Sequence, residues 1–90
     1  MVALRFLVYG RVQGVGFRWF VLREAKRRGL RGFVRNLRDG SVEVIAAGTA
    51  EALEELGRML EQGPAHAQVE HVERSDVPHE QVIPNEFDIR

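Results

Sequence analysis

The chain has 90 residues, with 13 Lys and Arg against 13 Asp and Glu, 44% apolar residues and no cysteine. This is enough for one globular domain and excludes a two-domain enzyme. The absence of cysteine excludes a disulfide scaffold, a thiolate nucleophile and a cysteine-ligated zinc or iron–sulfur site. No run approaches the roughly 20 apolar residues that span a bilayer, and residues 1–10 resemble a strand rather than a secretion signal. We therefore expect a cytoplasmic protein.

The charges are divided unevenly between the two halves of the chain. Residues 1–40 contain nine Arg and one Lys against two acids, and residues 41–90 contain three Arg against eleven acids, so net charges of +8 and −8 cancel. Such an asymmetry has two explanations. Either the first half binds an anionic ligand, or the two halves attract each other in the folded chain.

The first half of the chain predicts a strand, a helix and a hairpin. Residues 3–12 are rich in β-branched and aromatic side chains, which favours a strand. Apolar residues then recur with helical spacing over residues 17–28. Residues 30–37 and 41–47 flank the dipeptide Asp39-Gly40, a strong hairpin signal, and predict an antiparallel pair of strands.

The second half predicts one more helix and two more strands. The helix covers about 50–62, with Thr49 as its N-terminal cap. Strands follow over residues 68–77 and 87–89. The order β-α-β-β-α-β defines a ferredoxin-like α+β fold, with two helices packed on one face of an antiparallel sheet and a short terminal strand. Residues 1–90 thus form a single domain.

This topology brings the ends of the first two strands together. The crossover through the first helix makes these strands parallel, so both end at the same edge of the sheet, with the third strand running back between them. Two strand spacings place the ends roughly 10 Å apart. A small anion with its ligands fits that gap.

The most informative segment is the glycine-rich turn at residues 10–18, Gly-Arg-Val-Gln-Gly-Val-Gly-Phe-Arg. Glycines allow positive φ angles, and the helix that follows adds unpaired N–H groups and a positive dipole end, so the turn suits a phosphate-like anion. It lacks the Gly-Lys-Ser/Thr of a nucleotide P-loop and the third glycine of a dinucleotide fingerprint. The alternative is a tight strand-to-helix connection that binds nothing.

Two side chains near this turn are candidates for chemistry. Arg18 falls in the first turn of the helix, where the dipole disfavours a cation by about 0.3–1 kcal/mol, and a guanidinium can bind two phosphate oxygens. Asn36 is expected near the end of the second strand, at the same edge, where its amide can orient a water molecule. The alternatives are a solvated Arg18 and an Asn36 that prepares the hairpin turn.

Other catalytic groups are not indicated. The spacing of His66, His71 and His79 fits no helical metal pair, so we expect neither a metal site nor a cofactor. Residues 1–23 contain no acid, which leaves no carboxylate pair and no Ser-His-Asp set near the glycine turn.

The chain resembles the acylphosphatase family over essentially its whole length. Residues 8–20, Val-Tyr-Gly-Arg-Val-Gln-Gly-Val-Gly-Phe-Arg-Trp-Phe, are similar to the first signature of that family. Residues 32–43, Gly-Phe-Val-Arg-Asn-Leu-Arg-Asp-Gly-Ser-Val-Glu, are similar to its second. Phe33 stands where many members have Trp, and Trp19 where many have Tyr.

The resemblance implies a hydrolase acting on acid anhydrides. The expected reaction is metal-independent cleavage of the carboxyl–phosphate bond of an acyl phosphate by water attacking in line. Arg18 would hold the phosphate and Asn36 would orient the water. The expected phosphate-binding loop comprises Gln13, Gly14, Val15, Gly16, Phe17 and Arg18. We expect a monomer whose partners are an acyl phosphate and inorganic phosphate, without a cofactor, nucleic acid or membrane.

Two non-catalytic functions are the alternatives. One is an RNA-binding module, because RNA-recognition motifs share this element order and the first half of the chain is basic. Val34 stands where that motif needs Gly or Ala, however, and residues 42–48 lack the aromatic side chains that stack on bases. The other is a ferredoxin-like domain that binds an anion without turnover, against which the presence of both Arg18 and Asn36 argues.

Overall fold

The computed structural model describes residues 1–78 and 80–90. Seven elements follow one another, and their bounds agree with the expected ranges to within one residue. They are β1 (Val2–Arg11), α1 (Phe17–Arg27), β2 (Arg31–Asn36), β3 (Val42–Gly48), α2 (Ala50–Gln62), β4 (Gln68–Asp76) and β5 (Phe87–Ile89).

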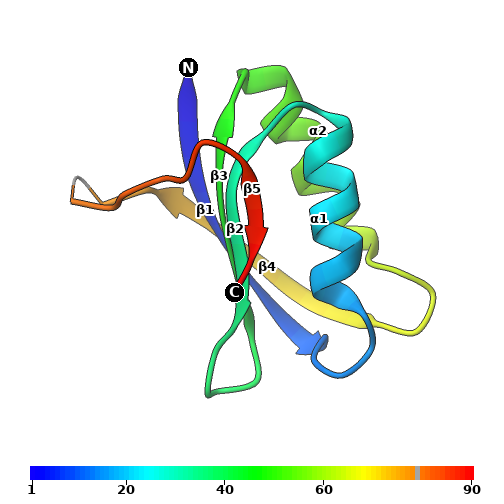
Figure 1. The fold of residues 1–90 in the computed structure, drawn as a ribbon. Coiled ribbons are helices and arrows are strands. Elements are labelled where there is room, and N and C mark those ends of the chain that lie inside the picture. Colours follow the sequence, from blue (N-terminus) through cyan, green and yellow to red (C-terminus); the bar gives the residue numbers. More distant parts are fainter. Residues whose placement is uncertain (79) are drawn as a thin grey trace.

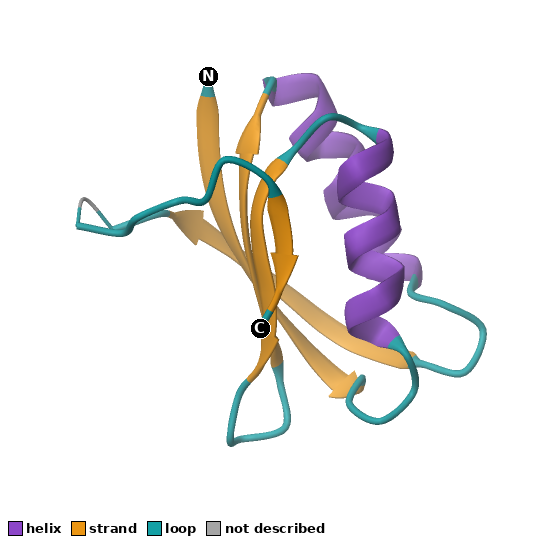
Figure 2. Ribbon diagram, viewed as in Figure 1, coloured by secondary structure: helices purple, strands orange, loops and turns teal. Residues whose placement is uncertain are grey.

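The five strands form one sheet in the order β4-β1-β3-β2-β5. Strand β3 lies between β1 and β2 and pairs antiparallel with both, so β1 and β2 run parallel. Both helices cover the same face of the sheet (Figure 1), and no described residue forms a helix on the other face (Figure 2). These features confirm the expected β-α-β-β-α-β architecture.

The terminal strand corrects one detail of the expected sheet. β5 pairs in parallel with β2, so the sheet is mixed rather than antiparallel throughout. The reason lies in the direction of β4, which runs antiparallel to β1 and ends near the edge of the sheet where β2 begins. The chain enters β5 from that edge and must run in the same direction as β2.

The hydrophobic core fills the space between the helices and the sheet. Alternate residues of the strands point toward the helices because side chains alternate across a pleated strand. The strands contribute Phe6, Val8, Val34, Val42, Val44 and Ala46. The helices contribute Phe17, Phe20, Val21, Ala25, Leu53, Leu56 and Leu60, and all of these side chains are buried.

Strand β3 is buried along all seven of its residues, including the acid Glu43. The Glu43 carboxylate accepts hydrogen bonds from Nε of Arg5 at 2.7 Å and from Nε of Arg35 at 2.5 Å. Because buried charges need partners, the two arginines satisfy this carboxylate and join β1, β3 and β2 on the face away from the helices. The pairs also join the basic half of the chain to the acidic half.

Gly57 provides a test of how α2 packs on the sheet. Glycine inside a helix is less favourable than alanine by about 1 kcal/mol. A Cβ at this position would lie 3.5 Å from Cε1 of Phe6, an ordinary van der Waals contact. We expect Gly57→Ala to stabilise the protein by about 0.5–1 kcal/mol and to raise the midpoint of thermal unfolding by about 2–8 °C.

Gly32 is the matched control. Its φ is +141°, and a Cβ there would lie 1.9 Å from the carbonyl oxygen of Ile45. We expect Gly32→Ala to lower the midpoint, because neither the backbone angle nor the strand spacing can accommodate the methyl group. A lower midpoint in Gly57→Ala would contradict the described packing of α2 on Phe6.

Candidate active site

The glycine-rich turn joins β1 to α1 in a conformation that favours glycine. Gly14 and Gly16 have φ angles of +75° and +78°, and Gly16 is the N-cap of α1. A Cβ added at either position would meet nothing within 4 Å. Glycine is therefore required by the backbone angle and not by lack of space.

Beyond the end of β1, the N–H groups of this turn have no acceptor among the described residues. The first N–H group of α1 that has a backbone acceptor is that of Phe20, which donates to the carbonyl oxygen of Gly16 at 3.1 Å. In the part of the chain that the structure describes, the backbone N–H groups of residues 14–19 donate to no protein atom, and the first turn of α1 contains no acid. Helix α2, by contrast, has Thr49 as a side-chain cap and Glu51 in its first turn. Helix α1 thus begins as an uncapped positive end.

A pocket of about 180 Å³ opens at this turn. It brings together Arg18 of α1 and Asn36 of β2, the two side chains that the sequence singles out. The end of β1, the start of α1 and the end of β2 all lie at the same end of the sheet (Figure 1). The lining comprises Val12, Gly14, Gly16, Phe17, Arg18, Trp19 and Asn36.

Arg18 is held at one point of its guanidinium group. Its Nη1 donates to the main-chain oxygen of Arg90, the residue after β5, at 3.1 Å. Among the described residues, no Asp or Glu side chain lies within ion-pair distance of Arg18. Since a guanidinium carries five N–H donors, most of them remain available to an anion in the pocket.

The Asn36 side chain does not take part in the hairpin turn. The turn is stabilised by Asp39, whose Oδ1 accepts hydrogen bonds from the Ser41 hydroxyl at 2.5 Å and from its N–H at 2.9 Å. The Ser41 hydroxyl bond is the main reason why the pKa of Asp39 lies below its usual value. The Asn36 amide makes no hydrogen bond to another described residue, which argues against the alternative that it prepares the turn.

Gln13 connects the glycine-rich turn to the hairpin. Its Nε2 donates to the carbonyl oxygens of Leu37 at 2.7 Å and Ser41 at 2.9 Å. The Gln13 side chain therefore fixes the distance between the turn and the end of β2. Sequence reasoning considered only the backbone of Gln13 and missed this bridge.

The pocket also differs in composition from the expected phosphate loop. Gln13 and Val15 are not part of its lining, whereas Val12 and Trp19 are. Trp19 could have been found from the sequence, because it falls outside the helical apolar spacing of Phe17, Phe20 and Val21. No comparable signal marks Val12.

The histidines lie outside this pocket where the structure describes them. His66 precedes β4, and His71 stacks on the Tyr9 ring with 5.8 Å between the ring centres. His79 lies outside the described residues. Over residues 1–78 and 80–90, no group of three or more His, Asp or Glu side chains could hold a metal ion. None of the described helices is long and apolar enough to cross a membrane.

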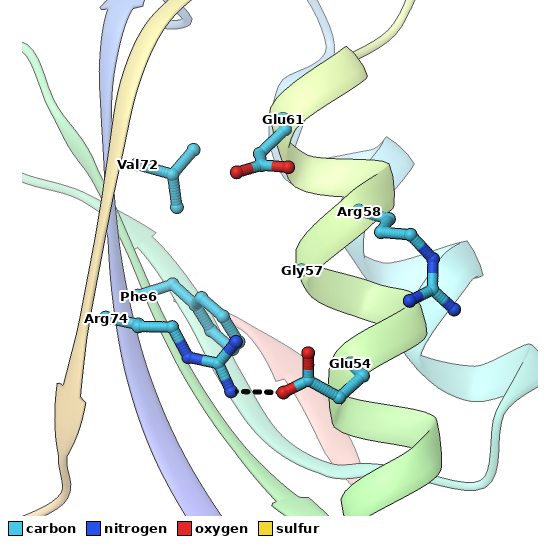
Figure 3. A pocket seen from close by; sticks show the side chains of 7 residues that line it. All are labelled: Phe6, Glu54, Gly57, Arg58, Glu61, Val72 and Arg74. Carbon is cyan, nitrogen blue, oxygen red and sulfur yellow. Dashed lines mark hydrogen bonds and ion pairs between the residues drawn. The ribbon is translucent and has the colours of Figure 1, made fainter.

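A second pocket, also of about 180 Å³, lies between α2 and strands β1 and β4 (Figure 3). Its charged side chains come in opposite signs. Nη2 of Arg74 donates to Glu54 at 2.7 Å, and this bond lowers the pKa of Glu54. With two acids against two arginines in its lining and no helix N-terminus, this pocket has no excess of positive charge for an anion. It is lined by Phe6, Glu54, Gly57, Arg58, Glu61, Val72 and Arg74.

The fold and the pocket define a ferredoxin-like α+β protein with a candidate anion site built from backbone amides, one arginine and one asparagine. The acylphosphatase family model matches residues 4–89, and the chain belongs to this family. The resemblance of the two signature segments is thereby confirmed.

Individual relatives agree over nearly the whole chain. The chain is 51% identical to the acylphosphatase of Nitratidesulfovibrio vulgaris over 86 residues. This aligned stretch covers 94% of this chain and 86% of the relative. The crystal structure of the acylphosphatase from Bacillus subtilis superposes with a TM-score of 0.85 at 38% identity, covering 100% of this chain and 99% of that one. The structure of an acylphosphatase from Coxiella burnetii gives a TM-score of 0.89 at 34% identity, covering 99% and 92%.

The Gln13 bridge leads to a testable prediction. In Gln13→Leu the carbonyl oxygens of Leu37 and Ser41 lose one donor each, which should destabilise the protein by about 1–3 kcal/mol in chemical denaturation. Activity measured well below the unfolding midpoint should fall as well, because the glycine-rich turn and Asn36 are no longer held together.

The control for this prediction is Gln62→Leu, at an exposed position near the end of α2. It should change neither stability nor activity appreciably. An equally stable and equally active Gln13→Leu would show that the bridge does not position the two parts of the pocket.

Proposed function

We propose that this chain hydrolyses the carboxyl–phosphate bond of acyl phosphates, with Arg18 and Asn36 as its catalytic side chains. Membership of the acylphosphatase family supports the reaction. The single structural observation that supports the residues is the pocket that Arg18 and Asn36 share with the glycine-rich turn.

The phosphoryl group is bound by charge and backbone donors. The N–H groups at the start of α1 point to a position where the helix dipole favours an anion, and the Arg18 guanidinium binds two of the phosphoryl oxygens. In a loose transition state the negative charge spreads over these oxygens, so fixed donors stabilise the transition state directly. Positioning and electrostatics then account for most of the rate.

Asn36 orients the attacking water. Its amide supplies both a donor and an acceptor, so it can hold a water molecule in line with the scissile bond. The water oxygen bonds to phosphorus as the phosphorus–acyl oxygen bond breaks. The electron pair of that bond leaves with a carboxylate, which needs no general acid. The pocket lining contains no carboxylate or imidazole, so the water proton passes to a phosphoryl oxygen.

The proposal extends to the partners of the protein. The substrate is a small acyl phosphate, and the phosphate product leaves from the same backbone site. We retain the expectations that the chain acts as a monomer in the cytoplasm and engages no nucleic acid.

Substitution of the two catalytic side chains tests the assignment. We expect Arg18→Ala and Asn36→Ala each to lower kcat for benzoyl phosphate by at least about 100-fold, as the loss of an oxyanion donor does. Arg18→Lys should retain part of the activity, since the charge remains but the planar fork is lost.

Arg23 serves as a control for these variants, because it is an exposed arginine of the same helix outside the pocket lining. Arg23→Ala should hydrolyse benzoyl phosphate at the parental rate. Turnover in Arg18→Ala close to that of an active parent chain would refute the assignment of Arg18.

The reaction should not depend on a metal ion. The proposed transition-state stabilisation comes from N–H groups and a guanidinium, so prolonged dialysis against a chelator should leave kcat and KM for benzoyl phosphate unchanged. A loss of activity that added Mg²⁺ or Zn²⁺ restores would show that a Lewis acid takes part.

A further inference from the structure

Trp19 differs from the other large aromatic side chains of the chain. It is the sole tryptophan, and its side chain is 65% exposed. The five phenylalanines are all buried, with Phe20, the most exposed of them, at 7%. The buried residues of the same helix, Phe17, Phe20 and Val21, supply its contact with the core. Trp19 is thus an aromatic residue that the core does not need.

Its position connects this exposed indole with the candidate active site. Trp19 directly follows Arg18 in α1 and lines the same pocket as Arg18 and Asn36. The other exposed large hydrophobic residues among those described, Met1, Val2 and Val82, do not line this pocket. Trp19 is therefore an exposed aromatic residue in the pocket lining, beside the groups proposed to bind phosphate.

We propose that Trp19 is the residue that selects the acyl group, and that it favours substrates with a flat apolar acyl part such as an aromatic ring. This inference rests on the proposed function. A phosphoryl group bound at the start of α1 fills the part of the pocket formed by backbone N–H groups and Arg18. The acyl group must then extend toward the remaining lining, where Trp19 presents its ring.

The expected effect follows from the size of aromatic contacts. A ring stacked on an indole gains about 0.5–1.5 kcal/mol beyond simple burial, which corresponds to about 3- to 10-fold in kcat/KM. An acetyl group is too small to stack and should gain little. Trp19 should therefore change the ratio of activities toward the two substrates, whereas Arg18 and Asn36 should affect both substrates alike.

The first experiment compares benzoyl phosphate with acetyl phosphate. In Trp19→Ala we expect kcat/KM for benzoyl phosphate to fall about 3- to 10-fold, mainly through KM, while kcat/KM for acetyl phosphate stays unchanged. Trp19→Phe should restore most of the preference, because it restores an aromatic face. Val82→Ala removes an exposed apolar side chain outside the pocket and should change neither value.

The outcomes separate selection from other roles. Equal losses for both substrates in Trp19→Ala would overturn the inference and would show that Trp19 supports the start of α1 or the position of Arg18. Unchanged kcat/KM for both substrates would overturn it as well, since the indole would then not contact the acyl group. Thermal unfolding of Trp19→Ala should match that of the parent chain, because the side chain is mostly exposed.

A second experiment needs no turnover. Because Trp19 is the sole tryptophan, the intrinsic fluorescence excited at the indole band reports on this site alone. Titration with phenylphosphonate should shift or quench the emission, whereas methylphosphonate and inorganic phosphate should have a much smaller effect. Equal responses to phenylphosphonate and methylphosphonate would contradict stacking on the indole.

The two experiments also distinguish this inference from the proposed function. If the parent chain hydrolyses neither acyl phosphate but responds selectively to phenylphosphonate, the hydrolytic function fails and the aromatic contact stands. If it hydrolyses both substrates and Trp19→Ala leaves their ratio unchanged, the function stands and the assignment of Trp19 fails.

Discussion

The placement of β3 between β1 and β2 is the constraint on which the candidate site depends. Because β3 pairs antiparallel with both neighbours, β1 and β2 must point the same way and end at the same edge of the sheet. The glycine-rich turn follows one of these ends, and Asn36 forms the other. Gln13 then closes the gap with hydrogen bonds to the hairpin. The topology gives proximity, and this one side chain makes the distance definite.

One of the two explanations for the opposite charges of the two halves, their mutual attraction, is seen in the structure. Glu43 and Glu55 of the acidic half accept hydrogen bonds from arginines of the basic half, so the halves do attract each other in the fold. Arg18 takes no part in these pairs. In a first turn without an acid, its charge adds to the helix dipole rather than offsetting it. Arg5, Arg28 and Arg35 thus join the two halves, and the proposed role of Arg18 is separate from these pairs.

Local signals predicted the elements well, since helical spacing and the hairpin dipeptide depend on neighbouring residues. The sequence signatures likewise identified Arg18 and Asn36, which the fold brings into one pocket. The features that the sequence did not predict depend on contacts between residues far apart in the chain. Nothing within residues 87–89 indicates which strand they pair with or in which direction. The acceptors of the Gln13 amide are backbone carbonyl groups 24 and 28 residues further along the chain, and a carbonyl group carries no sequence signal.

The two pockets of about 180 Å³ show that volume does not identify a functional site. In the pocket beside α2, Arg74 lies over the Phe6 ring and pairs with Glu54, and the two arginines of the lining are matched in number by two acids. At the start of α1 the backbone N–H groups of residues 14–19 have no acceptor among the described residues, and the first turn carries a cation where an acid would stabilise the helix. A protein that keeps such an arrangement gives up stability unless an anion completes it. The two pockets therefore differ in their unpaired donors and positive charge, and not in volume.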